Sequence, residues 1–241
     1  IDMTRANLSE ADSTNWDLSK TSYFKSTSNP KPLYIAKDDN GTVQPISMVP
    51  SIAYGPFGSY IIGFGTGKYL EASDNAISTS TQIQSFYTLY DQPDSQLDTE
   101  GNARFNGKTK LRKSTISTNT VSSSSFTWVS PRNSDSTETG QRKSGWYINY
   151  PNGGGAGGEQ QITNAVLFGK DIIFSSVLPP TASGSACGGG SSRTYTANLA
   201  TGIGTVSNLS ASAMGAPMLL QMGSTYSASG STGDRYKTDT V

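Results

Sequence analysis

The chain has 241 residues and carries 18 basic and 18 acidic side chains, with only 15% charged and 34% hydrophobic residues. Because the formal net charge is zero, the sequence lacks the positive excess that binding to nucleic acid or to an anionic membrane needs, and we expect neither as a main partner. No apolar run approaches the roughly 20 residues of a membrane-spanning helix. Abundant small polar residues favour turns and short strands over helices.

Short apolar segments bounded by turn residues predict strands in the first ninety residues. Residues 33–36 and 42–43 flank an Asn-Gly pair, which is a strong hairpin pattern. Residues 49–54 and 59–64 flank a tight turn rich in Gly and Pro. Residues 82–90 form the next predicted strand. Its alternating positions carry aromatic residues on both faces, so we expect packing on both sides.

Residues 91–145 differ in character, because apolar residues become sparse and Ser, Thr and Asn dominate. We interpret this stretch as a polar, Ser/Thr-rich insertion that projects from the core as a hairpin or long loops. It contains two modest predicted strands, at 111–117 and 126–129. Five basic residues between 104 and 113 predict a solvated loop, or an edge strand protected by its charges.

The second half repeats the pattern of the first. Predicted strands at 146–150, 162–168, 172–178 and 194–199 are separated by glycine-rich or polar turns, and a last one lies near 217–222. An apolar strand, a short glycine turn and a second apolar strand therefore occur twice. Repeated meanders of this kind predict an all-β fold, a modified β-propeller with few or no long helices. A β-sandwich is the alternative.

A single propeller blade cannot bury both of its faces and needs neighbouring blades. We therefore expect residues 1–241 to form part of a larger propeller domain.

Several kinds of chemistry are absent from this sequence. It has no histidine and one cysteine, Cys187, which excludes Ser-His-Asp and Cys-His catalysis, His- or thiolate-bound zinc and iron–sulfur sites. Paired carboxylates, as in glycoside hydrolases, remain possible, but the acidic residues lie mostly in polar loops. We therefore predict that the chain is not an enzyme. Cys187 could be a free thiol or pair with a cysteine elsewhere.

The glycine-rich stretch at 63–68 suggests a phosphate-binding loop but fails the pattern. A phosphate-binding loop needs a glycine at the position of Ile62 and a Ser or Thr at the position of Tyr69. The dinucleotide fingerprint fails as well, because Lys68 stands where its third glycine belongs. We interpret these glycines as a turn at which two backbone segments pass closely.

Calcium is the one metal to consider, because it needs only oxygen ligands. Asp38, Asp39 and Asn40 offer such ligands, but Val49 occupies the position of the bidentate glutamate in an EF-hand. They are weak candidates, and an ordinary turn is the favoured interpretation.

Aromatic side chains could stack on sugar rings if they are exposed. The candidates for such ligand contact are Trp128, Trp146 and Tyr147, with Tyr150 beside them. Alternation along a strand places at least half of these in the core. If one of them is exposed, a carbohydrate-binding propeller is a candidate function of the chain.

Several motifs, in order, resemble the C-terminal domain of the PilY1/PilC family of type IV pilus proteins. They are residues 64–70 (FGTGKYL), 79–87 (TSTQIQSFY), 90–91, 145–147 (GWY), 158–159, 174–179 (FSSVLP), the Cys187 loop and 197–202 (ANLATG). The match runs from about residue 50 to residue 202. No single motif is decisive, but their order and spacing are specific.

The resemblance implies a β-propeller in an extracytoplasmic protein of a Gram-negative bacterium, at the pilus tip or on the outer-membrane surface. It also implies a biogenesis factor and adhesin that supports pilus assembly, twitching motility and surface attachment. Minor pilins or pilus-tip proteins, and a host or abiotic surface, are the implied partners. The family's calcium loop lies upstream of the matched region, so no calcium ligand is assigned here and no cofactor is expected in this segment.

Overall fold

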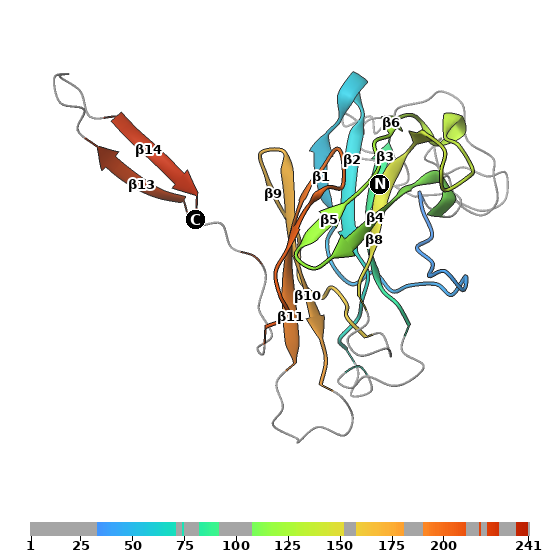
Figure 1. The fold of residues 1–241 in the computed structure, drawn as a ribbon, viewed down its shortest axis with the longest axis horizontal. Helices are drawn as coiled ribbons and strands as arrows, with labels where there is room; N and C mark the ends of the chain where they lie inside the picture. Colours follow the sequence, from blue (N-terminus) through green and yellow to red (C-terminus); the bar gives the residue numbers. More distant parts are fainter. Residues whose placement is uncertain are drawn as a thin grey trace, which may run out of the picture.

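A computed structural model of the chain describes residues 33–70, 74, 82–91, 108–151, 158–180, 190–210, 217, 221–226 and 235–240. Within these ranges the secondary structure consists of β-strands and of 3-10 helices of three residues each. The all-β prediction is therefore confirmed (Figure 1). No helix among these residues has the length and apolar character needed to cross a bilayer.

Ten strands form one sheet. In spatial order they are β1 (Ser51–Tyr54), β2 (Tyr60–Gly65), β3 (Ser85–Asp91), β8 (Gly145–Asn149), β4 (Arg112–Ser117), β5 (Thr120–Ser122), β12 (Gly204–Val206), β11 (Ser191–Asn198), β10 (Asp171–Leu178) and β9 (Val166–Phe168). Neighbours in this sheet are antiparallel except β4 and β8, which run parallel. Both predicted strand–turn–strand units are present, as β1–β2 and as β9–β10.

Smaller elements complete the described structure. Strand β6 (Thr127–Trp128) pairs in parallel with β7 (Arg142–Lys143), and β13 (Gln221–Tyr226) pairs antiparallel with β14 (Arg235–Thr240). The 3-10 helices are η2 (Pro56–Gly58), η4 (Lys108–Lys110) and η5 (Pro131–Asn133). The predicted hairpin at 33–43 is reduced to a tight turn closed by one bridge, between Lys37 and Val43.

The large sheet nearly closes on itself, because its first and last strands approach each other. Val49 lies two residues before β1, and its backbone N–H donates to Asn164 Oδ1 at 3.2 Å. Ser51 Oγ donates to the carbonyl oxygen of Ala165 at 3.0 Å. These bonds join β1 to the residues that lead into β9, and Figure 1 shows the two ends of the sheet next to each other.

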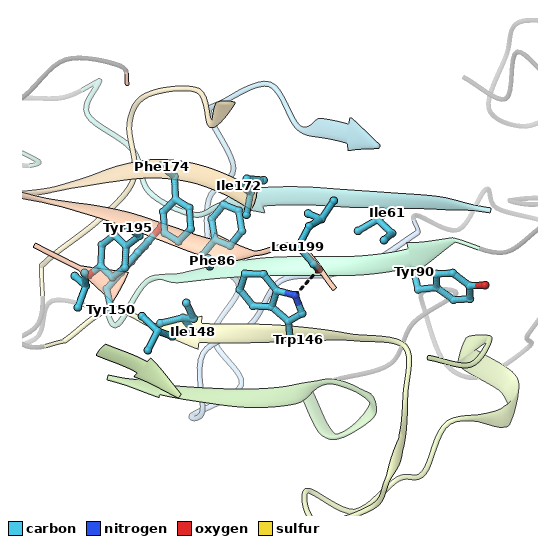
Figure 2. Close-up of a cluster of buried hydrophobic side chains, with 13 residues drawn as sticks. Ile61, Phe86, Tyr90, Trp146, Ile148, Tyr150, Ile172, Phe174, Tyr195 and Leu199 are labelled. Atoms are coloured by element: carbon cyan, nitrogen blue, oxygen red, sulfur yellow. Dashed lines mark hydrogen bonds between the residues drawn. The ribbon is translucent and has the colours of Figure 1, made fainter. Parts of the chain in front are cut away.

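The main core lies between the two halves of this curved sheet. Phe86 on β3 stacks on Phe174 of β10 with ring centroids 3.8 Å apart, and Phe174 stacks on Tyr195 of β11 at 4.8 Å. Trp146 on β8 donates its indole N–H to the carbonyl oxygen of Leu199 at 2.8 Å (Figure 2). Stacked aromatic rings add specific geometry to the burial of apolar surface, so they fix how the two halves meet.

Strand β3 is buried on both faces, as its alternation predicts. Phe86 and Tyr90 belong to the main core. Tyr87 and Leu89 belong to a second cluster on the opposite face of the sheet. The remaining buried members of this second cluster are Tyr34, Ala36, Phe64, Leu111 and Tyr147.

The polar stretch at 91–145 contributes to the core, contrary to the expectation from its composition. Strands β4 and β5 lie in the middle of the ten-stranded sheet. Leu111 is buried in the second cluster and Val121 in the main core. The sequence hides this role because few of the buried positions are apolar, and Arg112 and Ser114 occupy buried positions of β4. The expectation therefore fails for strands β4 and β5, and residues 92–107 lie outside the described part.

Candidate functional site

Three buried, positively charged side chains lie around the loop at residues 131–141, which begins with η5. Lys110, at the end of η4, and Arg112, on β4, are both buried. Lys143, on β7, has 0% of its surface exposed. A buried charge is costly unless hydrogen bonds satisfy it, so each of these side chains must have specific partners.

Backbone carbonyl oxygens are the partners of the two lysines. Lys143 Nζ donates to the carbonyl oxygen of Thr109 at 2.5 Å, to that of Asp135 at 3.3 Å and to that of Thr137. Lys110 Nζ donates to the carbonyl oxygen of Pro131 at 2.9 Å. The two ammonium groups therefore hold the first half of the loop against η4.

Arg112 holds the second half of the loop. Its Nη1 donates to the carbonyl oxygen of Glu138 at 3.1 Å, and its Nη2 donates to that of Gly140 at 2.6 Å. The same Nη2 lies 3.5 Å from the carbonyl oxygen of Ser125. Because the guanidinium group is planar and always charged, it fixes several acceptors in one geometry.

We call residues 131–141 the anchored loop. Its base is also closed by Asp135, which accepts hydrogen bonds from the backbone N–H of Arg142 at 2.9 Å and from Arg142 Nη2 at 2.9 Å. These bonds hold the pKa of the Asp135 carboxyl below its ordinary value. Burial, and then the neighbouring charge of Arg112, lower the pKa of Lys143.

Polar side chains make up the exposed surface of the anchored loop. The exposed residues are Arg132, Asn133, Ser136, Thr137, Glu138, Thr139 and Gln141. Hydrogen bonds from three charged side chains hold the backbone of this loop. The loop can therefore present its exposed side chains in one arrangement. Such preorganisation reduces the entropy lost on binding, so we take this loop as the candidate binding surface.

Trp128 lies beside the anchored loop and is the predicted ligand-contact residue that stays partly exposed. Strand β6 carries it, and the backbone N–H of Thr127 donates to the carbonyl oxygen of Gln141 at 2.7 Å. The Trp128 ring lies 5.3 Å from that of Phe126 and 5.4 Å from that of Tyr90. Its indole N–H donates to the carbonyl oxygen of Ala200 at 2.7 Å.

The other aromatic candidates are core residues. Trp146, Tyr147 and Tyr150 are buried. Trp146 and Tyr150 belong to the main core and Tyr147 to the second cluster. Because β8 packs on both faces, alternation does not leave one of its sides for a ligand, and the prediction of ligand contact at Trp146 and Tyr147 does not hold.

The weak calcium candidates are occupied by protein groups. Asp38 Oδ1 accepts the backbone N–H groups of Asn40 and Thr42 at 2.9 and 2.8 Å, which closes the turn. Asp39 is paired with Lys108 Nζ at 2.9 Å and accepts from Asn149 Nδ2 at 3.0 Å. These residues do not fit a calcium site. Nor do three or more acidic, His or Cys side chains gather anywhere in the described ranges.

Glu159 carries a buried carboxyl group whose burial no sequence motif marks. Glu159 Oε1 accepts hydrogen bonds from Ser176 Oγ and, at 2.6 Å, from the Tyr195 hydroxyl. Arg193 Nε lies 3.7 Å from Glu159 Oε2. Burial raises the pKa of the Glu159 carboxyl. Its hydrogen-bond donors Ser176 and Tyr195 lie 17 and 36 positions away in the sequence, so no local pattern marks it.

The glycines of the 63–68 stretch lie against the residues that follow Glu159. A Cβ on Gly65 would stand 2.0 Å from Gln161 Oε1, and one on Gly67 would stand 2.6 Å from the Gln161 carbonyl oxygen. The backbone N–H of Gln161 donates to the carbonyl oxygen of Thr66 at 3.0 Å. The predicted close approach of two backbone segments is therefore confirmed. The predicted turn is not found at Gly63 and Gly65, which lie within strand β2. The stretch 64–70 of the family resemblance therefore lies against Gln160 and Gln161, directly after the stretch 158–159.

The family model of the PilY1 beta-propeller domain matches residues 2–126. The chain belongs to this family. The Type IV pilus biogenesis factor PilY1 homolog of Xylella fastidiosa is 30% identical over 184 residues, covering 76% of the chain and 11% of that protein. The Type IV pilus biogenesis factor PilY1 of Pseudomonas aeruginosa is 29% identical over 172 residues, covering 66% of the chain and 14% of that protein.

The crystal structure of the Pseudomonas aeruginosa PilY1 C-terminal domain has a similar fold. The TM-score is 0.59 at 20% sequence identity, and the match covers 86% of the chain and 47% of that domain. The chain thus spans about half of the solved PilY1 domain and a small fraction of the curated PilY1 proteins.

Proposed function

We propose that this chain is a segment of a type IV pilus biogenesis factor that also acts as a pilus-tip adhesin. The observation that carries the proposal is its membership of the PilY1 propeller family, together with two curated relatives that are named as type IV pilus biogenesis factors. In this role the protein supports pilus assembly, twitching motility and attachment. It is displayed at the pilus tip or on the outer-membrane surface of a Gram-negative bacterium.

In this proposal the segment works by surface complementarity and not by catalysis. Its partners are minor pilins or other pilus-tip proteins, and a host or abiotic surface. The anchored loop is the surface that we assign to adhesion, because its exposed side chains are polar and its backbone is held by Lys110, Arg112 and Lys143. Calcium, if the protein uses it, is bound outside this segment.

The first experiment removes the codons for this segment from the chromosome, counts surface pili by electron microscopy and scores adhesion. Loss of pili supports a role in biogenesis, and normal pili with lost adhesion support a role confined to adhesion. Normal pili together with normal adhesion contradict the proposal.

A set of surface variants then tests the anchored loop. We expect the triple variant Arg132→Ser, Glu138→Ser, Gln141→Ser to keep normal pilus numbers and to lose adhesion. The matched control is Lys170→Ser with Asn208→Ser, which changes exposed residues in the other half of the sheet. Equal adhesion by both sets of variants would remove the loop from the adhesive surface.

A carbohydrate-binding propeller is the second candidate function, and Trp128 favours it. This partly exposed ring lies beside Phe126 and next to a loop rich in hydroxyl and amide groups, a combination that suits stacking on a sugar ring. Binding on a glycan array that Trp128→Ala abolishes would support this function. Silence on a broad array would leave adhesion to a protein or abiotic surface.

The absence of catalysis is also open to test. A panel of chromogenic glycosides addresses the one enzyme class that the sequence leaves possible. Hydrolysis that disappears when a carboxylate is substituted would contradict the non-catalytic proposal.

A further inference from the structure

Two of the buried, positively charged side chains that hold the anchored loop lack a buried counter-charge. Arg112 is 5% exposed and Lys143 is fully buried, and within the described ranges neither forms an ion pair with a carboxylate. Asp135 is paired with Arg142, and Glu138 is exposed to solvent. The carbonyl oxygens that accept hydrogen bonds from Arg112 and Lys143 carry no net charge, so two like charges lie buried without a neutralising partner.

The electrostatic cost of this arrangement is felt at Lys143. Burial, and after it the charge of Arg112, lower the pKa of Lys143, so the two positive charges are close enough to repel each other. The carboxylates of Asp135 and Glu138 act in the opposite direction and do not cancel these two effects. A negative charge close to both Arg112 and Lys143 would offset the repulsion.

Three buried hydrogen-bonding groups in this part of the molecule have no protein partner. Within the described ranges, Arg112 Nε, Ser130 Oγ and Ser144 Oγ form no hydrogen bond. A guanidinium N–H can only donate, and a hydroxyl group can donate as well as accept. Buried polar groups in folded proteins are nearly always hydrogen-bonded, so three donors without an acceptor indicate that an acceptor from outside the chain binds here.

The pairing of the strands brings these three groups to the same place. The backbone N–H of Val129 donates to the carbonyl oxygen of Lys143 at 3.0 Å, so the parallel pair β6–β7 continues and the next residues, Ser130 and Ser144, lie side by side. The backbone N–H of Ser144 also donates to the last carbonyl oxygen of η4 at 2.9 Å. Strand β4 begins two residues after η4, with Arg112.

We propose that a small monovalent anion, of the size and charge of chloride, binds between Arg112, Ser130 and Ser144. One N–H donor and two O–H donors would face it, and the charge of Arg112 would strengthen its binding. A single-atom ion fits better than a phosphate or sulfate, because the extra oxygens of a polyatomic anion would need further buried donors. The anion would supply the missing counter-charge and tighten the hold on the anchored loop. This inference does not depend on the pilus role.

Bromide tests the site directly, because it replaces chloride and can be located by its anomalous scattering. Crystals of the full-length protein are grown in sodium bromide. We expect an anomalous peak within hydrogen-bond distance of Arg112 Nε. Peaks confined to exposed positions would show an adventitious ion only, and a water molecule without anomalous signal at Arg112 would show that water serves these donors. Either result would overturn the proposal.

Hydrogen exchange measures the effect of the anion in solution. The full-length protein is compared in sodium chloride and in sodium gluconate of equal ionic strength, because gluconate is too large for an enclosed site. At a chloride concentration of about twice its Kd, we expect exchange across residues 131–141 to slow about threefold, since a ligand that binds only the closed state reduces opening by this factor. Exchange in β10 and β11 should not change. Equal exchange of the loop in the two salts would overturn the proposal.

Matched variants separate a bound ion from a general effect of salt. Ser130→Ala with Ser144→Ala removes two of the proposed donors and leaves the charged side chains that hold the loop in place. We expect this double variant to lose most of the chloride response. Ser117→Ala with Ser124→Ala makes the same chemical change at exposed positions and should keep the full response. The same chloride response in both double variants would contradict the assigned site.

Discussion

The aromatic core and the anchored loop are both well-defined parts of this protein, but different forces hold them. In the core, Phe86, Phe174 and Tyr195 stack in one column between two halves of a sheet. In the loop, Lys143 and Arg112 donate hydrogen bonds to carbonyl oxygens of a chain with almost no apolar residues. Apolar burial is not directional, so it holds whole strands together. A charged donor forms directional hydrogen bonds, so it holds individual backbone carbonyl groups in place. A polar loop can therefore be rigid without a core of its own.

The largest expected effect comes from the centre of the aromatic column. Phe174→Ala removes a fully buried ring that contacts both Phe86 and Tyr195, and the cavity it leaves cannot collapse between two paired strands. We expect a loss of about 3–5 kcal/mol in the free energy of unfolding, measured by denaturant titration. The control Phe168→Ala, at an exposed position of β9, should lose far less. Similar losses for both variants would mean that the column does not hold the two halves together.

A smaller and more local effect is expected when an anchoring charge is removed. Lys143→Met keeps the apolar stem but removes the ammonium hydrogen bonds to the carbonyl oxygens of Thr109, Asp135 and Thr137, at a cost of about 1–3 kcal/mol. Hydrogen exchange should speed up across residues 131–141 and stay unchanged in β10 and β11. Lys113→Met, at an exposed position, is the control. Unchanged exchange in the loop would show that the cations do not hold it.

The comparison also extends to pH, because the buried carboxyl group of Glu159 accepts a hydrogen bond from Tyr195 of the aromatic column. Burial raises its folded pKa above the ordinary 4.5, so the folded state binds this proton more tightly than the unfolded state does. The resulting stabilisation is complete below pH 4.5 and is lost as the pH rises through the folded pKa. We expect Glu159→Gln to remove this dependence when Tm is measured between pH 4 and 8. Parallel Tm profiles for the two proteins would contradict the assignment.

The smallest effect is expected at the exposed turn. Asp39→Asn removes the ion pair with Lys108, in which the Asp39 side chain is about half exposed, and should cost less than about 1 kcal/mol. The Tm should not respond to calcium or to EDTA in either protein, because the Asp38 and Asp39 carboxylates already have protein partners. A rise in Tm with calcium that Asp39→Asn abolishes would restore the turn as a metal site.

Local patterns were sufficient for some of the strands and for one contact between distant segments. Alternation along 82–90 predicted a strand packed on both faces, which β3 is. The glycines at 63–68 predicted a close backbone approach, and Gly65 and Gly67 lie against Gln161. Both predictions succeed because strand period and glycine geometry are properties of a few adjacent residues.

The candidate site was largely hidden from the sequence. The basic residues at 104–113 were predicted to be solvated, yet Lys110 and Arg112 are buried. Their partners are carbonyl oxygens of residues up to 28 positions away, and every residue type carries a carbonyl, so no composition or spacing marks such partners. The sequence also did not distinguish among the aromatic candidates Trp128, Trp146 and Tyr147. Only the packing of β8 against both clusters shows that Trp146 and Tyr147 are covered.

The sequence by itself therefore determined the all-β class, the repeated hairpins and the family, because these depend on turn residues, strand period and the order of short motifs. Tertiary structure alone decided that strands β4 and β5 of the polar stretch enter the sheet and the core and that three cations become anchors. The physical reason is the distance along the chain over which each effect acts. Conformational preference acts between neighbours along the chain, whereas burial and the satisfaction of buried charge depend on which distant segments meet.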